Sequence, residues 1–369
     1  MRSFNVWDRA GYDMHGLPIE HKVQAKLNLK YKDDIEKFGV GKFIQECKKL
    51  SVENLKLMNE DFRRMGVWMD FENAYQSINH DFIEGVWWLI KKADEKKRLY
   101  EGFRSVPWDY YHQSALAKHE LEYKLVLDKS IFWKFKVKDT ENEYLICWST
   151  TPWTLAYNLG VMVHPEFDYV KVKVKGEVWI VAKGLAGPFI QSVVGEKLEI
   201  IEEFKGKKLE GLRYEHPFYK ELKKHYDKIM SESKKAFTVV LSEEYVDLSA
   251  GTGLVHLAPG CGPEDYEVGH INKIPPWNNL TESGFYPDDM GKFSGRHAKE
   301  DNDSFIDDLD KAGSLIAITE VEHDYPFGQR SGKPVIFRAT KQRFMKVEDL
   351  KDEMIKENNN VRWVPDAAY

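Results

Sequence analysis

Polar side chains with the potential to bind a ligand are concentrated in one short segment of the sequence. Residues 147–158 read CWSTTPWTLAYN and begin at the end of a β-type run at 144–148. Hydroxyl and amide groups surround the Pro-Trp pair of this segment, and they belong to Ser149, Thr150, Thr151, Thr154 and Asn158. Functional groups are often placed where a strand passes into a loop, so this segment is a candidate site.

A second segment, further along the chain, combines an imidazole with a carboxylate. Residues 251–266 read GTGLVHLAPGCGPEDY, in which His256 stands between apolar neighbours. A Pro-Gly pair at 259–260 then breaks the strand pattern before Asp265. A strand that ends at such a break is a second place where functional side chains are expected, and we expect the two segments to form one site.

Each of these residues also has a purely structural interpretation. A lone histidine between leucine and valine residues is commonly a hydrogen-bonded core residue, and an isolated aspartate commonly caps a loop. Threonine is frequent in strands, and its hydroxyl often caps a turn. Trp153 is expected to pack in the core rather than to stack on a ligand. The residue types alone therefore leave both interpretations open.

Together the two segments resemble the editing pocket of isoleucyl-tRNA synthetases, whose pattern is close to WTTTPWTLPxN followed by GTGxVHxAPxxGxxDY. Valyl and leucyl relatives carry arginine where Trp153 stands, so the match is to the isoleucyl branch. Residues 1–20, MRSFNVWDRAGYDMHGLPIE, are similar to the synthetic-site segment of the same family. The stretches 62–71 and 333–344 also resemble its connective segments, so the resemblance covers nearly the whole chain.

This resemblance implies an α/β fold overall. A mainly β, barrel-like editing domain would be inserted between partial Rossmann-type and connective α/β pieces. The end of the first Rossmann half and a helical connective region would occupy 1–125, the editing domain 126–320, and a return connective segment 321–369. Residue periodicity predicts helices over 42–65, 82–99 and 347–357 and strands over 131–137, 144–148, 169–174, 177–181, 237–241 and 253–257.

The resemblance also implies a function, the hydrolysis of valine wrongly attached to tRNA(Ile), with the acceptor end of that tRNA as partner. Asp265 would bind the α-ammonium group, and Thr150 and Thr151 would complete the catalytic set. The substrate-binding residues would be Ser149, Thr154, Asn158 and His256, with the His256 ring limiting the depth of the side-chain pocket. Asp13 and His15 match the synthetic site and would be relics here.

Isoleucine activation is not expected of this chain, because neither the HIGH nor the KMSKS string of class I synthetases is present. We therefore expect an excised internal piece that needs no cofactor, whereas ATP and magnesium would serve the intact parent. A catalytically idle tRNA-docking or structural module and a free-standing trans-editing hydrolase are the alternatives.

Several positions depart from the family pattern. Ser149, Ala156 and Tyr12 stand where threonine, proline and tryptophan are usual. The zinc-knuckle strings are replaced by PWDYYH at 107–112 and YPFGQRSGK at 325–333, so no metal is expected.

Composition limits the possible partners. The formal net charge of −6 argues against a general binder of DNA or RNA, so RNA contact would require local basic patches. Lys171, Lys173 and Lys175 alternate with valines and share one face of a predicted strand, for which a solvated outer face is the simpler interpretation. No apolar run approaches the roughly 18 residues of a membrane span. The three widely spaced cysteines fit a reducing cytoplasm.

Overall fold

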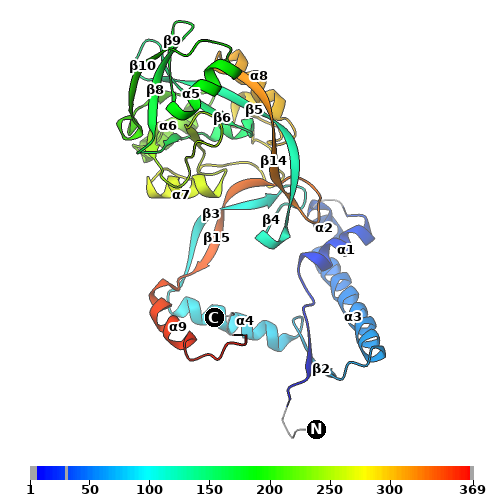
Figure 1. Cartoon of the computed structure of the whole chain (residues 1–369). Coiled ribbons are helices and arrows are strands. Elements are labelled where there is room, and N and C mark those ends of the chain that lie inside the picture. Colours follow the sequence, from blue (N-terminus) through cyan, green and yellow to red (C-terminus); the bar gives the residue numbers. More distant parts are fainter. Residues whose placement is uncertain (1–5, 30–31, 366–369) are drawn as a thin grey trace. The chain divides into compact units, whose positions relative to one another are not determined.

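Two compact units make up the chain in the computed structural model, which describes residues 6–29 and 32–365. One unit comprises Met1–Gly102 with Arg343–Tyr369, and the other comprises Phe103–Gln342. The fold is mixed α/β, as predicted, and the larger unit is built on a curled sheet (Figure 1). The predicted domain boundaries after residues 125 and 320 fall inside the long strands β5 and β14 rather than between the units.

The smaller unit is mainly helical. Its strand β1, Arg9–Tyr12, pairs in parallel with β2, Asp70–Gln76. The helices are α1 (Leu17–Leu27), α2 (Lys32–Phe38), α3 (Val40–Arg64), α4 (His80–Glu95) and α9 (Lys351–Asn358). The predicted helices over 42–65, 82–99 and 347–357 are therefore confirmed to within a few residues at each end.

The larger unit contains a sheet of ten strands that combines parallel and antiparallel pairs. Along its main path the strand order is β10-β8-β9-β6-β13-β7-β12, and β5 pairs with β6, β11 and β14. These strands are β5 (Leu121–Val137), β6 (Glu143–Ser149), β7 (Gly160–Val163), β8 (Asp168–Val174), β9 (Glu177–Ala182), β10 (Ile200–Lys205), β11 (Tyr214–Glu215), β12 (Thr238–Leu241), β13 (Val255–Leu257) and β14 (Leu315–Gly328).

The predicted hairpin is confirmed, because β8 and β9 pair antiparallel with Val174 opposite Glu177. Lys175 and Gly176 form its turn with positive φ angles of 50° and 86°. The alternation along β8 is also confirmed, since its valines are buried and Lys173 is exposed. Lys171 pairs with Glu143 at 2.9 Å. Positive charge on this face of the strand is therefore compensated at Lys171.

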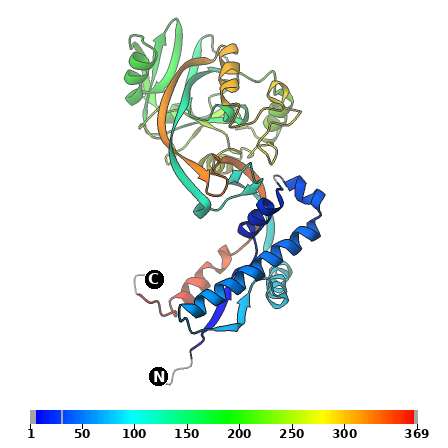
Figure 2. The ribbon, with the colours of Figure 1, turned by 90° about the vertical axis from the view of Figure 1, so that its right-hand side faces the viewer.

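The strand β14 was not predicted, because the sequence after residue 321 was interpreted as a return linker. β14 pairs antiparallel with β5 from Leu315 opposite Trp133 to Gly328 opposite Leu121, and Figure 2 shows the two strands running side by side. Charged residues occupy alternate positions along the exposed part of β14. Because few apolar residues stand there, the sequence pattern did not indicate a strand. Its pairing with β5 is a long-range interaction that local patterning does not report.

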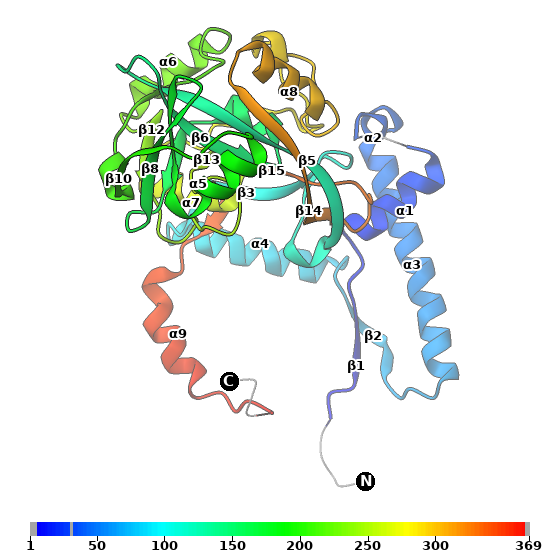
Figure 3. The same cartoon turned by 45° about the horizontal axis from the view of Figure 1, so that its top comes forward.

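Four helices of the larger unit lie around the sheet, and residue periodicity predicted none of them. They are α5 (Lys183–Gly187), α6 (Lys223–Glu232), α7 (Pro263–Ile271) and α8 (Asn302–Lys311). α8 buries Phe305, Ile306 and Leu309 and contacts β14, beside which it is seen in Figure 3. A further sheet joins β15 (Ile336–Met345), β3 (Leu99–Asp109) and β4 (Ser114–Ala115).

The core of the larger unit consists of aromatic and branched side chains from the sheet and from the helices that pack on it. Trp133, Phe135, Tyr157 and Tyr226 are almost fully buried within it. Trp153 is only 2% exposed, which confirms that it packs in the core. This core fixes the short 3-10 helix η2 (Pro152–Tyr157), all of whose residues are buried.

Candidate functional site

Strand pairing brings the two polar segments together. β13 lies between β6 and β7, with Val255 opposite Trp148 on one side and His256 opposite Val161 on the other. Because β13 and β6 are parallel, the residues that leave the end of β6 lie next to His256. The segments at 147–158 and 251–266 therefore meet at one place, as the sequence predicts.

A cavity of about 350 Å³ opens at this place. Five of the predicted site residues line it, namely Ser149, Thr150, Thr151, His256 and Asp265. The remaining lining comes from Trp148, Leu254, Val255 and the loop residues Tyr245, Asp247, Ser249, Ala250, Gly251, Thr252 and Gly253. Its volume lies at the lower end of the range that is typical of small-ligand pockets.

The hydroxyl groups at the end of β6 form a connected chain. Ser149 Oγ accepts a hydrogen bond from the Thr151 backbone N–H at 3.0 Å and lies 3.1 Å from Thr151 Oγ1. Thr151 Oγ1 lies 3.4 Å from Thr154 Oγ1, and Thr154 donates its own hydroxyl proton to the Thr151 carbonyl at 2.8 Å. These bonds hold the hydroxyls of Ser149 and Thr151 at the wall of the cavity.

The His256 ring is neutral and is held by a hydrogen bond to Thr154. Burial lowers the pKa of its imidazole to about 4. Its Nε2 lies 3.0 Å from Thr154 Oγ1. Thr154 Oγ1 also lies 2.8 Å from the Thr151 carbonyl, so the hydroxyl that faces Nε2 is held in place. His256 Nδ1 is buried with no hydrogen-bond partner among the residues that the structure describes.

Asp265 lies in the first turn of α7 rather than in a loop, because the helix begins two residues earlier, at Pro263. Its Oδ1 accepts a hydrogen bond from the Ala258 backbone N–H at 2.8 Å. Burial raises the pKa of the Asp265 carboxyl to about 7, with Glu264 adding to the effect and the Ala258 hydrogen bond opposing it. The carboxyl therefore titrates in the neutral pH range.

The Asp265 carboxylate packs so closely against the backbone at position 262 that this residue must be glycine. A Cβ built on Gly262 would lie only 2.3 Å from Asp265 Oδ2. Gly262 has φ −155°, so the requirement comes from this contact and not from backbone strain. Glycine at the start of α7 thus allows the Asp265 side chain to fold back toward β13.

Two predicted substrate-binding residues do not line the cavity. Thr154 is buried behind His256, to which it is hydrogen-bonded. Asn158 is fully buried, donates to the Gly160 carbonyl at 2.8 Å and accepts from the Tyr214 hydroxyl at 2.5 Å. Both the nitrogen and the oxygen of its amide group are hydrogen-bonded within the core, so Asn158 has a structural role.

Asp13 and His15 belong to the smaller unit. They follow β1, and their side chains are 83% and 57% exposed. His15 Nδ1 lies 3.1 Å from Asp13 Oδ1, and the Ser77 hydroxyl donates to the same oxygen at 3.4 Å. Their assignment as relics of a synthetic site stays a prediction.

The loop before residue 251 was missed as part of the cavity. Asp247 accepts hydrogen bonds from the Ser249 backbone at 2.9 Å and from the Ser249 hydroxyl at 2.6 Å, and these bonds lower the pKa of its carboxyl. Tyr245 donates its hydroxyl to Glu267 at 2.8 Å. The only signal in the sequence was the adjacency of this polar, small-residue run to the GTG string.

The two strings that replace the zinc knuckle meet in the structure. Asp109 is 2% exposed, and its Oδ2 lies 2.8 Å from His112 Nδ1. Burial alone would raise the pKa of Asp109, but hydrogen bonds from His112 and Ser331 hold it below its ordinary value. A carboxylate network thus joins these loops, and no group of three or more potential metal ligands occurs within 6–29 and 32–365.

Comparison with known proteins gives a match over the whole chain. The family of class I tRNA synthetases (I, L, M and V) matches residues 1–369. The isoleucine–tRNA ligase of Pyrococcus abyssi is 46% identical over 380 residues, which cover 99% of this chain and 35% of that protein. The Methanocaldococcus jannaschii isoleucine–tRNA ligase is 41% identical over 99% of this chain and 36% of that protein. The chain thus spans about a third of the length of these relatives.

Solved structures show a weaker likeness. The crystal structure of GlLeuRS-CP1 aligns with a TM-score of 0.40 at 18% identity, over 52% of this chain and 100% of that one. The P. knowlesi cytosolic leucyl-tRNA synthetase editing domain aligns with a TM-score of 0.29 at 12% identity, over 44% of this chain and 67% of that one.

Among the described residues, no helix combines the length and apolar character needed to span a membrane. On the strength of the family match over residues 1–369, the chain belongs to the class I tRNA synthetases of the I, L, M and V group.

Proposed function

We propose that this chain hydrolyses the ester of a mischarged aminoacyl-tRNA, valine on tRNA(Ile), in the cavity between β6, β13 and α7. The observation that carries the proposal is the meeting of the hydroxyls of Ser149 and Thr151, the ring of His256 and the carboxylate of Asp265 around one cavity. An aminoacyl ester has a free α-ammonium group, a side chain and a terminal ribose. The cavity offers complementary groups for the ammonium, the side chain and the ester bond to the ribose.

Asp265 is the group for the α-ammonium. Its pKa near 7 leaves a substantial ionised fraction at neutral pH, and a bound ammonium would increase that fraction. A charge-assisted hydrogen bond is about twice as strong as a neutral one. This contact would fix the orientation of the ester within the cavity.

His256 is the group that limits side-chain size. Its ring is buried, held by Thr154 and in edge contact with Trp133, with ring centroids 5.5 Å apart. A hydrophobic pocket separates substrates that differ by one methylene by only about 1 to 3 kcal/mol, a general figure for which isoleucine and valine in this enzyme family are the usual example. A steric stop in a second, hydrolytic cavity admits the smaller side chain only.

The hydroxyls of Thr150 and Thr151 are the groups for the ester and the attacking water. Nε2 of neutral His256 is hydrogen-bonded to Thr154 behind the cavity, so positioning of the water is assigned to the hydroxyls. Side chains of the described residues form no cluster with the ligands that a metal ion requires. ATP and magnesium would serve amino-acid activation by a longer synthetase.

Deacylation of valyl-tRNA(Ile) by the purified chain tests this function, with isoleucyl-tRNA(Ile) as the matched substrate. Hydrolysis of the valyl ester that clearly exceeds hydrolysis of the isoleucyl ester supports the proposal. Equal or absent hydrolysis of both esters would leave the tRNA-docking module as the better description. A free-standing trans-editing hydrolase predicts the same selectivity, and the reading frame that encodes the chain distinguishes it from a segment of a synthetase.

A further inference from the structure

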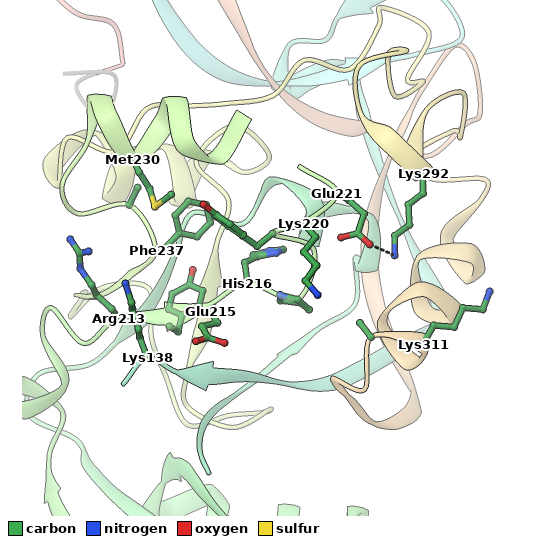
Figure 4. A pocket seen from close by; sticks show the side chains of 15 residues that line it. Lys138, Arg213, Glu215, His216, Lys220, Glu221, Met230, Phe237, Lys292 and Lys311 are labelled. Carbon is green, nitrogen blue, oxygen red and sulfur yellow. Dashed lines mark ion pairs between the residues drawn. The ribbon is translucent and has the colours of Figure 1, made fainter. Parts of the chain in front are cut away.

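A second, wider cavity of the larger unit shares no lining residue with the hydrolytic site and is rich in basic residues. Its volume is about 730 Å³. Five basic and two acidic residues line it, in a chain whose formal net charge is −6. Figure 4 shows these side chains around the cavity, with Lys138 and Arg213 on one side and Lys292 and Lys311 on the other. They come from separate parts of the chain, which fold together only in the tertiary structure.

Most of this positive charge is not neutralised by the protein. Lys292 lies 3.7 Å from Glu221 and 3.5 Å from Asp308. The other four basic residues are exposed and form no ion pair with any residue that the structure describes; they are Lys138, Arg213, Lys220 and Lys311. The cavity is therefore a concave surface with a net positive charge, which concentrates anions.

Three other lysines of the larger unit, Lys171, Lys205 and Lys208, behave differently. Lys171 pairs with Glu143, Lys205 with Asp168 at 2.8 Å, and Lys208 with Glu202 at 2.6 Å. Their charges are compensated by neighbouring carboxylates. Positive charge is available for an external anion at the large cavity and not at these three lysines.

The elements that carry these cations are fixed by the core. Lys138 follows β5, and its backbone N–H donates to the Arg213 carbonyl at 2.8 Å, so the two side chains start from neighbouring backbone positions. Buried Tyr214, His216 and Phe237 form the apolar part of the lining, while Tyr219 and Pro217 are partly exposed. A cationic rim beside the partly exposed aromatic ring of Tyr219 suits a nucleic-acid strand, whose phosphates contact cations and whose bases stack on aromatic rings.

The helix η2 connects residues of this cavity with a residue of the hydrolytic cavity. Thr151, which precedes η2, lines the hydrolytic cavity. At the other end of η2, Asn158 accepts the hydroxyl of Tyr214, and His216 Nε2 lies 3.0 Å from the Leu155 carbonyl. Tyr214 and His216 both line the basic cavity. An RNA held there would contact residues that are bonded to the element following Thr151.

We propose that the basic cavity is a docking site for backbone phosphates of an RNA strand, separate from the hydrolytic cavity. The choice of tRNA as the RNA rests on the proposed function. The cations come from opposite sides of a wide cavity, so successive phosphates of a strand match them better than one small anion does. Arginine suits such a site because its planar guanidinium can contact a phosphate through two N–H groups.

Binding of uncharged tRNA(Ile) to the purified chain tests this proposal, because it requires no ester and no hydrolysis. The double variants Lys138→Gln/Arg213→Gln and Lys220→Gln/Lys311→Gln each remove two exposed charges from the cavity. The matched control, Lys205→Gln/Lys208→Gln, removes two charges from lysines of the same unit that are paired with carboxylates. Fluorescence anisotropy at several salt concentrations gives the affinity and its salt dependence.

We expect both cavity variants to bind tRNA severalfold more weakly than the control. The slope of log K against log salt should become shallower by about 0.7 to 0.9 for each phosphate that the variant no longer neutralises. An affinity and slope equal to those of the control would overturn the proposal. ATP binding that disappears in the cavity variants while tRNA binding persists would assign the cavity to a small phosphate ligand instead. Hydrolysis of valyl-tRNA by the wild-type protein bears only on the hydrolytic cavity, so the two proposals fail independently.

Discussion

Burial shifts the pKa values of Asp265 and His256, and each shift favours the neutral form of the side chain. Burial raises the pKa of the carboxyl to about 7 and lowers the pKa of the imidazole to about 4. At neutral pH the cavity therefore contains a carboxyl that titrates and a histidine that does not. This difference separates an electrostatic role for Asp265 from a steric role for His256.

Replacing Asp265 by asparagine tests the electrostatic role. Asparagine has nearly the same size, and its carbonyl oxygen can still accept the Ala258 N–H, so only the charge is removed. We expect kcat/KM for valyl-tRNA deacylation to fall at least about tenfold, because the variant cannot form an oriented charge-assisted bond. Asp307→Asn, on the exposed face of α8, should have no effect.

The pH profile gives an independent check on the same residue. Wild-type kcat/KM should rise with pH and level off above about 7, as Asp265 ionises in the free protein. The Asp265→Asn variant should lack this step. If both proteins show the same profile, or the same rate at pH 7, Asp265 does not bind the ammonium group.

Replacing His256 by alanine tests the steric role. Removal of the ring enlarges the cavity while Asp265 and the hydroxyls of Ser149 and Thr151 stay in place, so isoleucyl-tRNA should become a substrate. Selectivity should change more than the valyl rate, since one methylene is worth only about 1 to 3 kcal/mol in a pocket of this kind. Deacylation rates for the two esters measure the ratio.

Thr154→Val is the matched control for His256→Ala. It removes the hydrogen bond to Nε2 but keeps the ring and the shape of the buried side chain. This variant should be less stable by about 1 to 3 kcal/mol, because polar groups are left without a buried partner, yet it should still reject the isoleucyl ester. If His256→Ala abolishes valyl hydrolysis and never cleaves isoleucyl-tRNA, the ring is not the size limit.

Among the elements, α7 determines where the carboxylate lies. The helix begins at Pro263, and its first turn places a negative charge where the helix dipole favours one. The N-cap glycine, Gly262, leaves space for Asp265 Oδ2. The geometry of this helix start thus controls the distance between Asp265 and the residues of β13.

Gly262→Ala should displace the carboxylate without unfolding the chain. The added Cβ would lie 2.3 Å from Asp265 Oδ2, so the side chain or the first helical turn must move. We expect reduced valyl-tRNA deacylation with an unchanged circular dichroism spectrum. Gly187→Ala, at the end of α5, introduces the same methyl group with nothing within 4 Å and should retain full activity. Equal activity of the two variants would show that the carboxylate position is not critical.

Across the whole molecule, buried titratable groups make stability depend on pH in opposite directions. The pKa of Asp265 is raised from 3.8 to about 7, so the folded state binds more protons between these values and stability falls as pH rises through them. The pKa values of His256 and His216 are lowered to about 4 and about 3. These imidazoles stay neutral in the folded state, so they reduce stability as pH falls below about 6.5.

The difference between wild-type protein and Asp265→Asn isolates the carboxyl contribution. The wild-type free energy of unfolding, relative to the variant, should decrease between about pH 4 and pH 7 by up to about 1.4 kcal/mol per pH unit. Above about pH 7 the difference should be constant. Urea unfolding at a series of pH values measures it. A difference that stays flat from pH 4 to pH 7 would show that the carboxyl titrates normally.

Elements with local patterns could be predicted from the amino-acid sequence. Helical spacing predicts α3 and α4, and alternation of lysine and valine with a Lys-Gly turn predicts the hairpin of β8 and β9. The two polar segments also stand out in the sequence, because their unusual composition is readable without a structure. These features depend on neighbours within one turn or one strand, so short-range patterning is enough to predict them.

Which residues of the two polar segments reach the cavity, and which stay in the core, was decided only by the folded chain. Parallel pairing of β13 with β6 brings His256 to the cavity that Thr151 lines, whereas the same fold withdraws Asn158 into the core to bind Tyr214. The pairing of β14 with β5 and the gathering of distant cations around the large cavity are further examples. Such outcomes depend on long-range strand pairing and on burial, and the free energy of both is set by the whole packed sheet rather than by any local run of residues.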